Sequence, residues 1–71
     1  MGHDQAHSLV NIDYKGKEYT ALCHSHADTI TVQHALGHQS ARLKPGTNTE
    51  LLKKLLLREI LIEAEKRGEL S

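Results

Sequence analysis

The side chains best suited to chemistry in this sequence are five residues in the middle of the chain, namely Cys23, His24, His26, His34 and His38. Imidazole nitrogens are good ligands for zinc, copper and nickel, and three of them with an open fourth position would resemble a catalytic zinc site. Residues two apart in a strand share a face, so His24 and His26 project together, and His34 on a neighbouring strand would come close to them. The spacing therefore suggests a metal site made by the four histidines, with zinc or another transition metal as the cofactor.

Other features of this segment favour less reactive roles. No pair of CxxC units is present, and Asp28 is the nearby carboxylate that could orient an imidazole. Cys23 falls on the opposite face of its strand from His24, so we interpret it as a small buried hydrophobic residue and not as a ligand or nucleophile. Clustered histidines are also commonly plain solvent-facing side chains. At a contact between subunits they would sense pH, because protonation makes them repel one another.

Length and composition limit the possible functions. The 71 residues form one domain, near the size at which a single hydrophobic core becomes marginal. Nine basic and nine acidic residues give a formal net charge of zero, and the chain has two tyrosines but no phenylalanine or tryptophan. Nucleic acid is disfavoured as a partner, because both the positive charge and the aromatic stacking surfaces are lacking. The single cysteine cannot form an internal disulfide, which fits a reducing compartment, most simply the cytoplasm.

The strands that would position the histidines follow from the alternation of apolar and polar residues. Ser8–Tyr14 and Glu18–His26 alternate on either side of a turn that contains Gly16, which predicts a β-hairpin. Thr29–Leu36 is predicted as a third strand because it is rich in β-branched residues. The residues expected to share one face of this strand are Ile30, Val32, His34 and Leu36. Ala41–Leu43 is either a short fourth strand or an extended linker.

The segment Thr47–Gly68 predicts one long helix. Thr47 and Glu50 fit a capping box at its start, and Gly68 can adopt the left-handed conformation that ends a helix. No Gly or Pro interrupts the roughly 20 residues between them, which would make a rod about 30 Å long. An antiparallel sheet with this helix packed across one face would bury the apolar sides of both.

Apolar residues run round most of the predicted helix. Leu51, Leu55 and Ile62, with Leu52 beside them, form one stripe at about 100° per residue. A second set lies on the far side of the helix and consists of Leu56, Leu57, Ile60, Leu61 and Ala64. Because one small sheet covers only one side, we predict that this second set contacts another copy of the chain in a homodimer, or a partner helix. A membrane span is not expected, because it needs about 20 apolar residues and the uncharged run here ends at Arg58.

Three segments resemble HicA-type toxins, which are small ribonucleases with an α-β-β-β-α order. His24-Ser25-His26, Ile30–His34 and Leu43–Thr47 stand in the order of that family's two histidine-containing strands and of the Lys-Pro-Gly-Thr segment that opens its helix. The resemblance covers about half of the chain, and it implies RNA as the substrate with His24 or His26 as the catalytic residue. The sequence departs from the family pattern because it has no first helix and no Pro before His34.

Taken together, the sequence predicts an α+β fold of order β-β-β-(β)-α, with a three- or four-stranded antiparallel meander and one long C-terminal helix. Residues 1–7 are expected to be a disordered arm and residues 8–71 a single domain. The function favoured by these features is that of a small, non-enzymatic binding or regulatory module that self-associates through its helix. The alternatives are a histidine metal-binding protein and a HicA-like toxin that binds or cleaves RNA.

Overall fold

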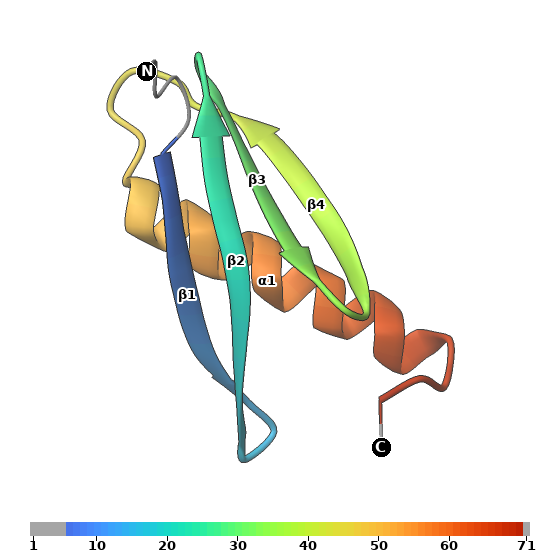
Figure 1. Ribbon diagram of the computed structural model, residues 1–71. Helices are drawn as coiled ribbons and strands as arrows, with labels where there is room; N and C mark the ends of the chain where they lie inside the picture. The colour runs from blue at the N-terminus through green and yellow to red at the C-terminus, as the bar shows by residue number, and fades with distance from the viewer. Residues whose placement is uncertain (1–5, 71) are drawn as a thin grey trace.

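Four β-strands and then one helix follow one another along the chain in the computed structural model, which describes residues 6–70 (Figure 1). The elements are β1 (Ala6–Tyr14), β2 (Lys17–His26), β3 (Thr29–His34), β4 (Gly37–Arg42) and α1 (Thr49–Lys66). The predicted α+β class, with an antiparallel sheet followed by one C-terminal helix, is confirmed, and the optional fourth strand is present.

The sheet is a meander in the order β1-β2-β3-β4, and each neighbouring pair of strands is antiparallel. Lys15 and Gly16 join β1 to β2, and both have positive φ, at 53° and 82°. Two-residue hairpin turns need positive φ because only then does the turn match the right-handed twist of the strands. Ala27, in the turn between β2 and β3, also has a positive φ of 56°. Both turns lie where the sequence predicted them.

Five strand boundaries differ from the prediction, and two of them, the start of β2 at Lys17 and the end of β4 at Arg42, differ by a single residue. β1 begins at Ala6, whereas the first five residues of the predicted arm lie outside the described part of the chain. β3 ends at His34 and not at Leu36, because the Leu36 N–H donates to His34 Nδ1 at 3.1 Å and the chain turns there. β4 therefore starts earlier than predicted and covers Gly37–Arg42 in place of Ala41–Leu43.

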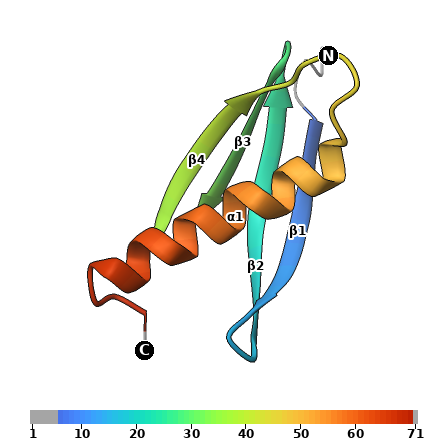
Figure 2. The same ribbon diagram turned by 180° about the vertical axis from the view of Figure 1, so that it is seen from behind.

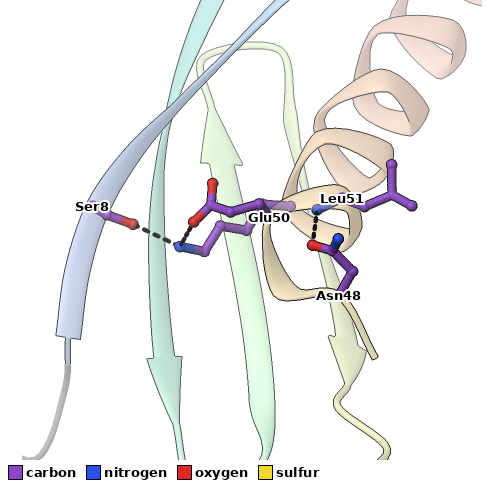
Figure 3. Close-up of polar contacts among 5 residues, drawn as sticks. Ser8, Asn48, Glu50 and Leu51 are labelled. Atoms are coloured by element: carbon purple, nitrogen blue, oxygen red, sulfur yellow. Dashed lines mark hydrogen bonds and ion pairs between the residues drawn. The ribbon is translucent and has the colours of Figure 1, made fainter. Parts of the chain in front are cut away.

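The first turn of α1 is capped by Asn48, whose Oδ1 accepts a hydrogen bond of 3.1 Å from the Leu51 N–H (Figure 3). The predicted capping box is wrong. Thr47 Oγ1 accepts instead from the Lys44 N–H at 3.3 Å, and the Glu50 carboxylate contacts a lysine of the next turn. Asn is at least as effective as Thr at the N-cap position, and Asn48 directly precedes the first helical residue.

The end of α1 agrees with the prediction. Gly68 has a φ of 78°, and the backbone N–H of Glu69 donates to the Ala64 carbonyl at 2.9 Å. This left-handed glycine followed by a bond back into the last turn is the common way in which a helix satisfies its final carbonyls. The chain after the helix is thereby turned back towards the sheet, where Leu70 packs against the core.

The helix crosses one face of the sheet obliquely, from the beginning of β1 towards the turn between β3 and β4 (Figure 2). The core lies between the two layers. The sheet contributes Val10, Ala21, Cys23, Ile30 and Val32, and the helix contributes Leu56, Leu57, Ile60, Leu61 and Ala64. The other face of the sheet carries no helix in the described part of the chain.

The placement of the second helix set corrects one prediction. Leu56, Leu57, Ile60, Leu61 and Ala64 were expected to meet another chain, but all five are buried against the sheet of their own chain. These residues form two adjacent columns on the helix, which is wide enough to cover a flat sheet, whereas the other stripe is a single narrow column.

No helix within residues 6–70 is long and apolar enough to cross a membrane.

Candidate functional site

The four predicted metal ligands lie on different parts of the sheet. Their positions in the strands send His24, His26 and His38 to the open face, where they stand opposite Thr31, Thr29 and Gln33 respectively. His34 lies on the other face, where its ring is 6.1 Å from the Tyr19 ring in an edge-on arrangement. His34 is thus separated from His24 by the thickness of the sheet.

The separation has a simple cause. The same alternation that puts Ile30 and Val32 into the core puts His34 on their face, because side chains two apart in a strand share a face. His24 is opposite Thr31, which is an outward position between these two. Among residues 8–70, no group of three His, Cys, Asp or Glu side chains lies where it could hold a metal ion.

Cys23 occupies the centre of the core, with 1% of its surface exposed. Burial raises the pKa of its thiol, because the thiolate would lose its hydration. The Lys53 ammonium and a hydrogen bond from Ser8 act in the opposite direction on the pKa but are weaker. A protonated, buried thiol is a poor nucleophile and a poor metal ligand, so Cys23 serves as a small core residue.

Next to Cys23, a polar cluster ties the start of α1 to β1. Lys53 Nζ lies 3.2 Å from Ser8 Oγ and 3.4 Å from a Glu50 carboxylate oxygen (Figure 3). The Lys53 side chain is mostly buried, with 15% exposed, whereas the Glu50 side chain is 74% exposed. We interpret the cluster as a contact that holds the start of the helix against β1.

A second polar cluster lies at the other end of the helix. The Tyr14 hydroxyl donates to Glu65 Oε1 at 2.8 Å, and Lys15 Nζ forms an ion pair with Glu65 Oε2. The Lys15 and Tyr14 hydrogen bonds lower the pKa of Glu65, and the same contacts raise the pKa of both Lys15 and Tyr14. The cluster therefore holds a carboxylate, an ammonium and a neutral phenol together at neutral pH.

A cleft of about 370 Å³ opens beside this second cluster. It is lined by Tyr14, Lys15, Gly16, Lys17, Tyr19, Glu65 and Leu70. The helix crosses the sheet obliquely and does not pass over the turn between β1 and β2, whose residues line this cleft (Figure 1). Both aromatic residues of the chain are at this corner.

Sequence reasoning missed the cleft, although part of the signal was present. Tyr14 and Tyr19 flank one predicted hairpin turn and alternate onto the same face as Ile12, with which Tyr19 pairs across the strands. Glu65 is 51 residues from Tyr14 in the sequence, so its approach depends on the direction in which the helix crosses the sheet. The hairpin alone does not encode that direction.

A smaller cleft of about 270 Å³ lies where the helix passes the turn between β3 and β4. There the Arg67 guanidinium donates to the Leu36 carbonyl at 2.9 Å and pairs with Glu69 at 2.9 Å. These contacts fasten the end of the helix to the turn, as Lys53 fastens its beginning to β1.

The side of α1 that faces away from the sheet retains an apolar stripe. Leu51 is 55% exposed and Leu55 is 48% exposed. Ile62 lies seven residues after Leu55, on the same side of the helix, and is half-buried. We call Leu51, Leu55 and Ile62 the outward stripe. The two other large exposed apolar side chains in residues 6–70, Leu9 and Leu22, pair with each other on the open face of the sheet.

Comparisons with protein-family models, with curated protein sequences and with solved structures found no match to this chain.

Proposed function

We propose that the protein is a non-enzymatic binding module that pairs with a second copy of itself through the outward stripe of α1. The observation that carries this proposal is the half-exposure of Leu51 and Leu55, one helical turn apart on a helix whose other side is filled by its own sheet. Covering two leucines on each chain removes apolar surface from water, which favours association. Contact with a second copy, which the sequence predicted for the inner side of the helix, is therefore proposed for the outer side.

The charges beside the outward stripe fit a second copy. At 100° per residue, Lys54 and Arg58 lie on one flank of the stripe with Glu65, whose carboxylate is held by Tyr14 and Lys15. Glu59 and Glu63 lie on the other flank with Lys66, whose ammonium is 3.9 Å from the Glu63 carboxylate. In a parallel pair of helices related by a two-fold axis, Lys54 and Arg58 of each helix face Glu59 and Glu63 of its partner. Glu59 follows Lys54 by five residues, and Glu63 follows Arg58 by five, so both pairs would meet in one register. Such flanking ion pairs set orientation in coiled coils.

The expected complex is weak. The outward stripe has three apolar residues on each chain, far fewer than the roughly 20–30 residues that each partner contributes to a standard interface. The protein should therefore be monomeric when dilute and dimeric when concentrated, and it should not need the dimer to fold, because its core is closed by its own helix.

Sedimentation over a range of concentrations tests this proposal. The wild type should show a concentration-dependent dimer, and Leu55→Lys should remain monomeric. Leu22→Lys is the matched control, because Leu22 is similarly exposed, at 41%, but lies on the open face of the sheet. A wild type that stays monomeric at the highest concentration would refute the proposal, and so would a Leu22→Lys variant that loses the dimer while Leu55→Lys keeps it.

A charge exchange tests the orientation separately. Arg58→Glu should weaken the dimer because it places a carboxylate opposite Glu63 of the partner. Arg58→Glu combined with Glu63→Arg should restore it, because residues 58 and 63 again carry opposite charges. Loss of the dimer in both variants would rule out the parallel arrangement while leaving association through the leucines intact.

A further inference from the structure

We propose that the cleft at the β1–β2 turn binds a small organic anion, with its apolar body against Tyr14 and Tyr19 and its carboxylate or phosphate group at Lys17. The volume of the cleft, about 370 Å³, lies at the lower end of the range of small-molecule sites, which is roughly 300–1,000 Å³. Its lining combines two phenol rings and Leu70 with a few charged groups. Ligand pockets usually combine apolar walls with a few polar groups, and this cleft is more polar than that, because three of its seven lining residues are charged.

The charges of the cleft select an anion. Glu65 is its single acidic lining residue, and the Lys15 ammonium and the Tyr14 hydroxyl already occupy both oxygens of that carboxylate. Lys17 makes no hydrogen bond or ion pair with any of residues 8–70, and its side chain is exposed beside Tyr19. Lys17 is thus the one lining cation of the cleft whose charge is not already compensated, and an anionic group in the cleft would reach it.

The geometry of the cleft is fixed before a ligand arrives. The hairpin turn on one wall is held by the ion pair between Lys15 and Glu65, and the opposite wall is the end of a helix that Arg67 fastens to the Leu36 carbonyl. Binding to such a site does not have to order a loop, so less of the binding free energy is lost to conformational entropy.

The test uses benzoate as the probe in a ¹H–¹⁵N NMR titration of the full chain. We expect benzoate to shift the backbone amides of Tyr14–Tyr19 and of Leu70. Lys17→Gln should weaken binding roughly two- to fivefold, as expected for loss of an exposed ion pair. Lys44→Gln, an exposed lysine in the loop before α1, is the matched control and should bind benzoate like the wild type.

The charge of the probe decides the result. Benzylamine has a ring of the same size with a positive charge, and it should shift the same amides much less at equal concentration. Equal shifts from both probes would overturn the proposal, because the cleft would then recognise only an apolar ring. Equal affinity for benzoate in the wild type and in Lys17→Gln would overturn it as well, as would shifts confined to residues outside the cleft.

Discussion

The side of α1 that faces the sheet and the side that faces solvent are both rich in leucine and isoleucine, and yet the sheet covers only one of them. On the inner side, Leu57 and Leu61 have no exposed surface. On the outer side, Leu51 and Leu55 keep about half of theirs, at 55% and 48%. The same residue type thus stabilises the fold on one side of the helix and is available for a partner on the other.

The difference comes from the width of each apolar surface. The inner side has two neighbouring columns, and the strands below it present small or β-branched residues such as Ala21 and Val32, which need bulky side chains above them. The outer side has a single column, with Lys54 and Arg58 along one flank. A single column cannot cover a sheet of four strands, but it can contact another narrow helix surface. The total apolar content of a helix therefore does not identify the side that forms the core.

The largest expected effect comes from a pair of substitutions that compare the two sides directly. Leu57→Ala should lower the free energy of unfolding by about 2–5 kcal/mol, because it removes a fully buried side chain and leaves a cavity. Leu55→Ala should change it by no more than roughly 0.5 kcal/mol in dilute protein, because the side chain is half exposed and Ala favours a helix. Urea denaturation measures both changes in the free energy of unfolding, at a protein concentration low enough for the chain to be monomeric. Similar losses for the two variants would mean that the two sides of α1 do not differ as described.

Most of the secondary structure could be predicted from the sequence, but the way in which the helix packs on the sheet could not. Alternation in β1 and β2, the Gly16 turn and the Gly68 helix end are local signals, and each is found where it was predicted. The side of the helix that packs on the sheet is not a local property, because apolar residues surround most of α1. It was decided by the fit to the strands.

The same limit applied to the candidate sites. Strand alternation alone could have excluded His34 from a cluster with His24, because it assigns His34 to the face of Ile30 and Val32. No local pattern could have brought Glu65 to Tyr14, because that contact depends on the angle at which the helix crosses the sheet. Sites formed within one strand or hairpin are therefore accessible to sequence reasoning, and sites formed between layers are not.

A smaller effect is expected at the start of the helix, where the outward stripe begins. Asn48→Ala should lower the free energy of unfolding by about 1 kcal/mol, within a range of roughly 0.5–2 kcal/mol, because the Leu51 N–H loses its acceptor. It should also weaken the proposed dimer, because fraying of the first turn displaces Leu51. Urea denaturation and sedimentation measure the two effects.

Thr47→Ala is the informative control for the cap. Thr47 accepts from the Lys44 N–H in the preceding turn and not from an amide of the helix, so its loss should cost less than the loss of Asn48. If Thr47→Ala were the more damaging substitution, the capping box predicted from the sequence would be correct and the assignment of Asn48 as the cap would be wrong.

The smallest effect is expected at the far end of the helix, where Glu65 joins the inner side of α1 to the β1–β2 turn. The folded state lowers the pKa of Glu65 below its ordinary value of 4.5 through Lys15 and Tyr14. A depressed carboxyl pKa stabilises the fold above the ordinary value, and this stabilisation is lost as the pH falls through the folded value. Glu65→Gln, which keeps the shape but removes the charge, should therefore be slightly less stable than the wild type at pH 7, with the difference shrinking towards pH 3. Glu59→Gln, on the outer side, is the matched control in dilute protein, because Glu59 has no ion-pair partner among residues 8–70. Unfolding curves at both pH values measure the stability of each variant relative to the wild type. Equal pH dependence in the two variants would mean that the contacts of Glu65 contribute no more to the fold than an exposed charge on the solvent side of the same helix.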